Sequence, residues 1–352
     1  MPRPLITRLS PSLTILYDSL AGQVAADMPV IPGTPGTVSI RTNQAKDEFF
    51  VHRYSDGANK SIERYIGLIK DEDAVVRATQ LKRDIDEINA ALSEARILAS
   101  AGYQVADKPS YVTLAILHLH DLFRLGAALI GSHAFGALTN QLGIRTDGYR
   151  TEDIDVARRE ELALENPIDF LEVLKGTGID FVGVPRLKLE EPSTSFKQAG
   201  KSRFIVDLLA PSSDSRIGLI PVPELNAHAA TLPYLAYLLG RTHMGILLGT
   251  TGICPVRLPA PERFAIHKLI VSQLRESRDA KVGKDIFQAS VLLAALAESF
   301  PGAITEAVKE IPISAVSKLK RGLAMAQKKH LETYPDAIEE AVSAIGYLEK
   351  LK

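Results

Sequence analysis

Two Asp-Ile-Asp triplets, Asp84–Asp86 and Asp153–Asp155, carry the residue types best suited to bind a hard metal ion. Carboxylate oxygens are ligands that Mg²⁺ and Mn²⁺ prefer. Aspartates at positions i and i+2 share one face of a β-strand, with Cα atoms roughly 6.5 to 7 Å apart. In an α-helix they point about 200° apart and cannot converge on one ion. The local secondary structure therefore decides which triplet can bind a metal.

The first triplet falls within a predicted helix. Between residues 71 and 100 the apolar residues recur at spacings of three and four, and Gly102 follows as a helix stop. Asp84 and Asp86 come directly after Lys82 and Arg83 in a polar stripe. We therefore interpret this triplet as a solvated helix face.

The second triplet falls on a predicted strand. A short apolar run ends at Gly131 and Ser132, and a segment with helical spacing and a glycine-containing loop lead from there to Asp153. A third carboxylate, Asp207, lies in the continuous apolar run 203–211, which is typical of a strand buried on both faces. Because burying an unpaired carboxylate is costly, we expect Asp207 to have a charged partner or a metal ion.

In this order, these features resemble the signature of the DNA polymerase β-type nucleotidyltransferase superfamily: Gly-Gly or Gly-Ser after an apolar residue, a downstream Asp-x-Asp, and a carboxylate on a neighbouring strand. The resemblance implies an α+β fold, with a nucleotidyltransferase-type mixed β-sheet and flanking helices. It also implies transfer of a nucleoside monophosphate from an NTP to a hydroxyl acceptor, with release of pyrophosphate. Asp153, Asp155 and Asp207 would be catalytic and hold two Mg²⁺ or Mn²⁺ ions, and Asp207 would hold the ion nearest the nucleophile. Gly131 and Ser132 would bind the triphosphate.

Two further helices are predicted in the block 261–296, where Lys268 lies among apolar neighbours. The turn between them carries a charged cluster: Arg278, Lys281, Lys284 and Asp285. From the residues alone, a solvated basic turn with a snorkelling lysine explains the pattern equally well. The block is also similar to the helical portion of nucleotidyltransferase toxins from abortive-infection-type toxin–antitoxin pairs. That similarity implies that Lys268 contacts the triphosphate, that Lys284 and Asp285 close the nucleotide site, and that an antitoxin-like partner exists.

The resemblance covers roughly residues 115–295 and has one departure. Ser132 and Asp153 are separated by 20 residues, about twice the familiar spacing. The extra loop contains residues that can cover the nucleotide or receive the acceptor: Arg145, Asp147, Tyr149 and Arg150. This long form looks most like a subgroup of predicted bacterial nucleotidyltransferases. We interpret His133, next to Ser132, as a packing or capping residue in preference to a phosphate ligand.

The chain is expected to divide into three parts. Residues 1–110 form a hairpin-plus-helix module, residues 111–257 the catalytic core, and residues 258–352 a helical C-terminal domain. In the first part we predict a short helix, a Pro/Gly-rich linker over 28–39, and a hairpin over 48–69 that turns at Asp56-Gly57.

Composition narrows the class of protein without naming the acceptor. The formal net charge of −1 gives no global basic field, and the single Cys254 excludes an internal disulfide. The absence of a secretory signal and of an uninterrupted apolar span predicts a cytoplasmic protein with no membrane partner. Basic residues over 317–332 offer a surface for RNA, although a solvated helix face explains them more simply. An RNA or tRNA end, a protein hydroxyl and a small molecule all remain open as acceptors, as does a catalytically inactive module that binds RNA or protein.

Overall fold

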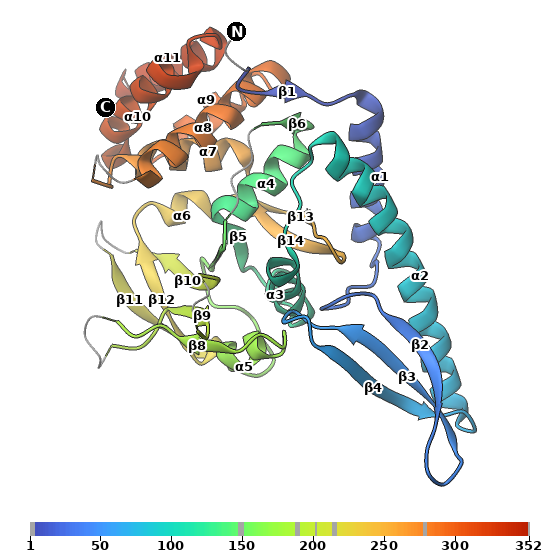
Figure 1. The fold of residues 1–352 in the computed structure, drawn as a ribbon. Coiled ribbons are helices and arrows are strands. Elements are labelled where there is room, and N and C mark those ends of the chain that lie inside the picture. Colours follow the sequence, from blue (N-terminus) through green and yellow to red (C-terminus); the bar gives the residue numbers. More distant parts are fainter. Residues whose placement is uncertain are drawn as a thin grey trace.

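The computed structural model describes residues 4–146, 151–186, 191–200, 203–212, 217–276 and 280–350. Within these ranges the protein has the expected α+β architecture. A mixed sheet lies below a group of C-terminal helices in the view of Figure 1, and an N-terminal arm lies on the other side of the molecule. None of the described helices combines the length and apolar character needed to cross a membrane. Of the residues considered above, Asp147, Tyr149, Arg150 and Arg278 lie outside the described ranges.

The N-terminal arm contains a three-stranded antiparallel sheet beside one long helix, and it projects away from the rest of the molecule (Figure 1). The arm is formed by β2 (Thr37–Thr42), β3 (Glu48–Ser55), β4 (Ser61–Leu68) and α2 (Glu72–Ala101). The elements before it in the chain are β1 (Thr7–Arg8), which lies beside the C-terminal helices, and α1 (Pro11–Ala25) (Figure 1). The predicted hairpin is confirmed as β3 and β4. The linker prediction over 28–39 is wrong at its end, because residues 37–39 already belong to β2, which pairs with β3.

Helix α2 carries the first Asp-Ile-Asp triplet, as predicted. The Asp71 side chain caps its N-terminus by accepting a hydrogen bond from the Asp73 N–H, and Gly102 ends it in the left-handed conformation. Asp84 accepts a hydrogen bond from Gln80 at 2.8 Å, and Asp86 is exposed. The triplet is therefore surface charge on a helix.

The central sheet holds its strands in the order β11-β12-β10-β7-β5, and β9 pairs with both β10 and β8. The elements of this region are α3 (Lys108–Leu119), β5 (Ala128–Ile130), α4 (Gly131–Gln141), β6 (Ile144–Arg145), β7 (Asp153–Ala157), α5 (Phe170–Lys175), β8 (Phe181–Gly183), β9 (Ser195–Gln198), β10 (Ile205–Pro211), β11 (Gly218–Val222), η1 (Pro223–Leu225), β12 (Ala227–Leu232) and α6 (Leu235–Leu238). Strand β10 is parallel to β7 and β12, whereas β5 is antiparallel to β7. The unit β5-α4-β7 is the predicted strand, Gly-Ser turn, helix and strand, with the short strand β6 in the loop.

A second hairpin leads into the C-terminal helices. The elements are β13 (Thr242–Leu248), β14 (Ile253–Pro259), α7 (Pro261–Ser272), α8 (Ala280–Ser299), α9 (Ala303–Lys309), η2 (Ile313–Ala315), α10 (Val316–Ala326), η3 (Gln327–Leu331) and α11 (Pro335–Lys350). The boundary expected at residue 257 falls inside β14, and β1 pairs with β6 across the boundary expected at residue 110. The division into three domains stays a prediction.

One continuous hydrophobic core joins the central sheet to the C-terminal helices. It includes Ile154 and Val206 from the strands and Leu269 and Leu292 from α7 and α8, all fully buried. Close-packed interiors hold their side chains in fixed rotamers. Polar residues of α7 and α8 that face the sheet are therefore held in fixed positions relative to it.

Candidate active site

Three carboxylates share one face of the central sheet. Asp207 on β10 lies directly opposite Asp155 on the parallel strand β7, and Asp153 precedes Asp155 by two residues. The intervening residues Ile154 and Val206 point to the other face and are fully buried. All three aspartates are only partly buried. The expectation that β10 is buried equally on both faces is therefore wrong at Asp207, whose side of the strand is more open.

The three carboxylates are close enough to disturb one another's ionisation. The pKa of Asp155 is raised from 3.8 to about 6, first by burial and then by the negative charge of Asp207. Burial also raises the pKa of Asp207, and the charge of Asp153 adds to the effect, while a hydrogen bond with Ser195 opposes it. Without a cation between them, the carboxylates repel each other.

Gly131 begins α4 next to Asp155. The residue before it, Ile130, is the antiparallel partner of Asp155, and Gly131 itself has a φ of 68°. A Cβ atom at this position would overlap with the Oδ2 atom of Asp155. Glycine is therefore required twice, once for the left-handed backbone and once for the close approach to the carboxylate.

The N-terminus of α4 has no side-chain cap in the structure. Its first N–H groups, together with the Ser132 hydroxyl, are donors suited to an anion, and the helix dipole favours negative charge there. These donors begin immediately beside the carboxylates.

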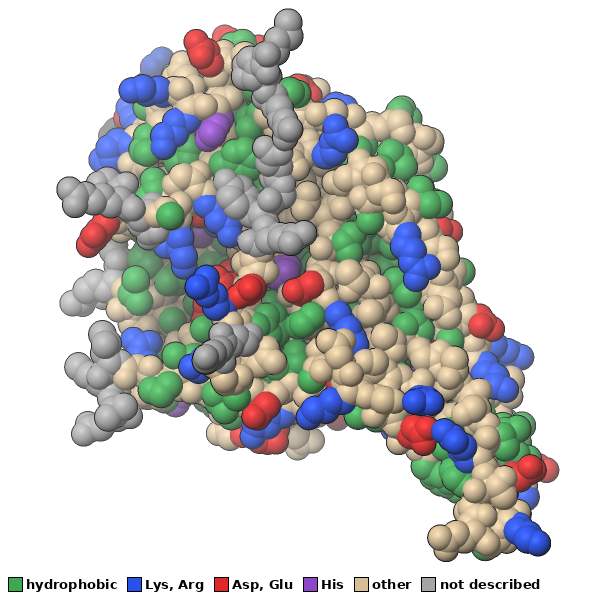
Figure 2. Space-filling view, viewed as in Figure 1, with side chains coloured by type: hydrophobic (Ala, Val, Ile, Leu, Met, Phe, Trp, Pro, Cys, Tyr) green, Lys and Arg blue, Asp and Glu red, His purple; other side chains and the backbone are tan. Residues whose placement is uncertain are grey.

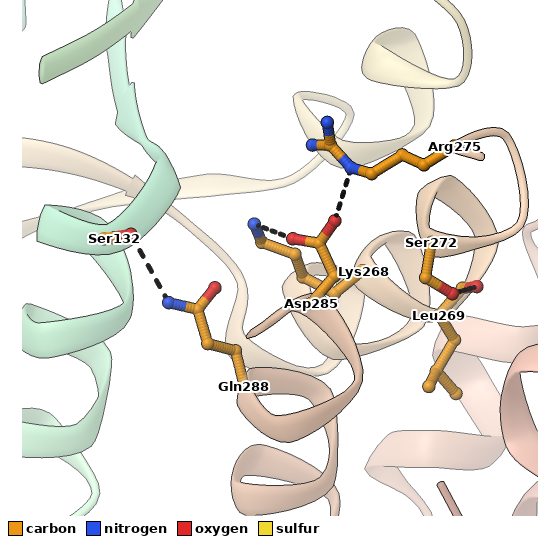
Figure 3. Close-up of polar contacts among 7 residues, drawn as sticks. All are labelled: Ser132, Lys268, Leu269, Ser272, Arg275, Asp285 and Gln288. Carbon is orange, nitrogen blue, oxygen red and sulfur yellow. Dashed lines mark hydrogen bonds and ion pairs between the residues drawn. The ribbon is translucent and has the colours of Figure 1, made fainter. Parts of the chain in front are cut away.

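Lys268 on α7 and Asp285 on α8 form an ion pair in the structure. The Lys268 Nζ atom donates to Asp285 Oδ1 at 2.7 Å, and the Arg275 Nε atom donates to Asp285 Oδ2 at 2.9 Å (Figure 3). The Asp285 side chain is only 3% exposed. Both oxygens of a buried carboxylate are therefore occupied by cations from α7 and the segment that follows it.

Lys284 and Lys281, in the first turns of α8, bring positive charge to the carboxylates. The pKa of Lys284 is lowered, first by burial and then by the charge of Lys268, and the charges of Asp153 and Asp155 oppose this shift. Lys281 in turn lowers the pKa of both Asp155 and Asp207. Acidic and basic side chains accordingly gather with a histidine near the middle of the face shown in Figure 2.

The carboxylates do not form a finished metal site by themselves. Among the described residues, no group of three or more His, Cys, Asp or Glu side chains is close enough to hold a metal ion. Mg²⁺, however, is commonly bound by one or two protein carboxylates together with substrate phosphates and waters. The paired Asp155 and Asp207, with Asp153 beside them, are a donor set that fits an ion arriving with a triphosphate.

Comparison with known proteins identifies the family of this chain. A family model described as Nucleotidyltransferase matches residues 113–312, more than half of the 352-residue chain. The chain belongs to this nucleotidyltransferase family. The crystal structure of an antigenic nucleotidyltransferase-like protein from Paracoccidioides brasiliensis is similar at 17% identity, with a TM-score of 0.33, over 67% of this chain and 90% of that chain. None of the curated proteins compared matches the chain.

The candidate site contains residues that the sequence analysis did not single out. Gln288, which is fully buried on α8, directs its Nε2 atom at the Ser132 hydroxyl at 3.5 Å (Figure 3). Its Oε1 atom has no hydrogen-bond partner in the part of the chain that the structure describes. Arg275 was also missed. Helical spacing contained a signal for Gln288, which follows Lys284 by four residues on α8. Arg275 lies beyond the end of α7 at Ser272, so helical spacing does not predict it.

The basic residues proposed for RNA lie on α10 and η3 of the nucleotidyltransferase. Lys320 pairs with Glu349 at 2.6 Å, and Lys318 donates to the Ser314 carbonyl and lies over the Tyr234 ring. These contacts occupy two of the cations at the surface. RNA binding at this face stays a prediction.

Replacing Asp285 tests the ion pair. In Asp285→Asn, Lys268 and Arg275 keep their charges without a full counter-charge, and we expect the free energy of unfolding to fall by about 2 to 4 kcal/mol in urea denaturation. Asp47→Asn is the matched control, because its partner Lys70 is 70% exposed and an exposed pair contributes below about 1 kcal/mol. Equal losses in the two variants would contradict a special role for Asp285.

Proposed function

We propose that the protein transfers a nucleoside monophosphate from an NTP to a hydroxyl acceptor and releases pyrophosphate, with Mg²⁺ or Mn²⁺ as cofactor. The observation that carries the proposal is the alignment of Asp207 with Asp155 on parallel strands, with Asp153 on the same face. Cations on α8 and an uncapped helix N-terminus flank these carboxylates. Family membership supports the transfer chemistry and leaves the acceptor open.

The triphosphate would lie between α4 and the cations of α7 and α8. Ser132 and the first N–H groups of α4 would donate hydrogen bonds to phosphate oxygens. Lys268 and Lys284 would neutralise charge on the β- and γ-phosphates. With both of its oxygens held by Lys268 and Arg275, Asp285 serves better to position Lys268 than to contact the nucleotide.

The transfer step would begin when the acceptor oxygen attacks the α-phosphorus. The bond between the α-phosphorus and the bridging oxygen breaks, pyrophosphate leaves, and the acceptor proton passes to Asp207 as the proposed general base. Asp153, Asp155 and Asp207 would hold the metal ions. When bound, these ions supply charge neutralisation and Lewis-acid stabilisation of the phosphates.

An inactive module that only binds RNA or protein is the second candidate function. Asp155 and Asp207 argue against it, because the charge of Asp207 disfavours the ionised form of Asp155. A scaffold without catalysis is free to lose such carboxylates. A role as a toxin with an antitoxin-like partner rests on the sequence resemblance alone and stays a prediction.

Transfer of label from an NTP radiolabelled at its α-phosphate tests the proposal. The purified protein is incubated with each NTP, Mg²⁺ or Mn²⁺, and cell extract. We expect a labelled product that Asp153→Asn/Asp155→Asn fails to make, because two metal ligands are lost. The matched double variant Asp84→Asn/Asp86→Asn, on the exposed face of α2, should retain the wild-type rate. No product with any NTP, or equal product from both double variants, would overturn the assignment.

A further inference from the structure

A cavity of about 750 Å³ adjoins the carboxylates on the side of α4 that faces residues 104–107 and 247–250. Ser132 and His133 of α4 line it, as does Glu152, the residue before Asp153. Its volume lies within the range of small-molecule sites. The cations proposed to bind the triphosphate, Lys268 and Lys284, lie outside this described lining, on α7 and α8.

The cavity differs in charge from the nucleotide site. None of the described residues that line it is Lys or Arg, whereas Asp107 and Glu152 are acidic. Against the described lining residues, a phosphate would meet these two acidic side chains and no Lys or Arg, and the backbone of RNA would meet the same repulsion. A neutral or cationic group would meet no such penalty.

His133 gives the cavity a neutral polar wall. The pKa of His133 is lowered to about 4, chiefly by burial, so its imidazole is uncharged near neutral pH. Its Nε2 atom has no hydrogen-bond partner among the described residues. His133 lines the cavity from α4, and its ring lies within electrostatic reach of Asp153. A neutral imidazole can exchange a hydrogen bond with a hydroxyl group.

We infer that this cavity binds the acceptor, and that the acceptor is a small, phosphate-free hydroxyl compound that is neutral or cationic. The inference rests on the proposed function and narrows it. The acceptor hydroxyl would approach the carboxylates past Ser132 and Glu152, while the triphosphate lies on the cation-bearing side. A nucleic-acid acceptor does not fit this charge distribution.

The test compares three acceptor pools with an NTP radiolabelled at its α-phosphate. Wild-type protein is incubated with the low-molecular-mass fraction, the total RNA or the total protein of a cell extract. Thr250→Arg places a large cation at the wall of the cavity, where Thr250 is exposed. Thr42→Arg makes the same change on exposed β2, away from the cavity. Affinity for a non-hydrolysable ATP analogue with Mn²⁺ is measured for each protein by calorimetry.

We expect label on a low-molecular-mass product. Thr250→Arg should reduce that labelling by about tenfold or more through occlusion and repulsion, whereas Thr42→Arg should not. Affinity for the ATP analogue should stay unchanged in both variants.

Label on RNA or protein alone would overturn the inference and leave the proposed transfer chemistry standing. Labelling by Thr250→Arg at the wild-type level would also overturn the inference. So would a loss of affinity for the ATP analogue in Thr250→Arg as large as its loss of labelling, because the cavity would then bind the nucleoside. No label in any pool would count against the proposed function itself.

Discussion

Gly131→Ala is expected to lower kcat/KM for nucleotidyl transfer by about 100-fold or more, although it adds one methyl group. The new Cβ atom would overlap with Asp155 Oδ2, and the φ of 68° is unfavourable for any residue with a side chain. Relief of the overlap must move either the Asp155 carboxylate or the start of α4. Either movement would separate the proposed metal ligand from the proposed donors for the triphosphate.

Gly22→Ala is the matched control for this substitution. Gly22 lies inside α1, and a Cβ atom there meets nothing within 4 Å. Alanine is a better helix former than glycine, so this variant should gain about 0.5 to 1 kcal/mol of stability and keep full activity. Steady-state kinetics and thermal unfolding of the two variants provide the comparison. Wild-type kinetics in Gly131→Ala would show that Asp155 does not need its present position.

Asp155→Asn is expected to have opposite effects on activity and stability. Loss of a metal ligand should reduce transfer by about 10³-fold, because metal ions supply several kcal/mol of transition-state stabilisation. In the absence of metal, however, the variant should be more stable than wild type near neutral pH. Asparagine has nearly the same shape as aspartate and carries no charge. It therefore avoids the free-energy cost that burial and the charge of Asp207 impose on ionised Asp155.

The pH dependence of that gain follows from the raised pKa. Folding raises the pKa of Asp155 from 3.8 to about 6, so its contribution to stability is fully present below about pH 3.8 and is lost as the pH rises through 6. Ionised Asp155 therefore costs up to about 3 kcal/mol near pH 7. Thermal unfolding with EDTA should show Asp155→Asn above wild type near pH 7 and level with it near pH 4.

Mg²⁺ with NTP should reverse this order. Ligand binding to the folded state stabilises wild type by mass action, and Asp155→Asn should lack most of that gain. Asp84→Asn should follow wild type under every condition, since Asp84 lies on the surface of α2. A variant that is less stable than wild type in EDTA near pH 7 would mean that Asp155 is held by favourable contacts instead of being strained by like charge.

The sequence by itself determined the local elements that carry the site. Helical periodicity put Asp84 and Asp86 on α2, and an apolar run before Gly131 followed by helical spacing predicted β5 and α4. Periodicity and glycine punctuation depend on residues within one or two turns of each other, so a single sequence contains them. The sequence analysis did not predict strand β2, because the prolines and glycines before it indicate a loop. Pairing with β3 stabilises this strand.

Only the tertiary structure decided how those elements meet. The register that puts Asp207 opposite Asp155 depends on pairing between strands far apart in the sequence. Lys268 and Arg275 bind the two oxygens of Asp285 because α7 packs against α8. Gln288 reaches Ser132 because this part of α8 lies next to the start of α4. The cavity beside α4 exists because segments around residues 104–107 and 247–250 come together there. These arrangements follow from side-chain packing and strand register across the whole chain, which no local pattern specifies.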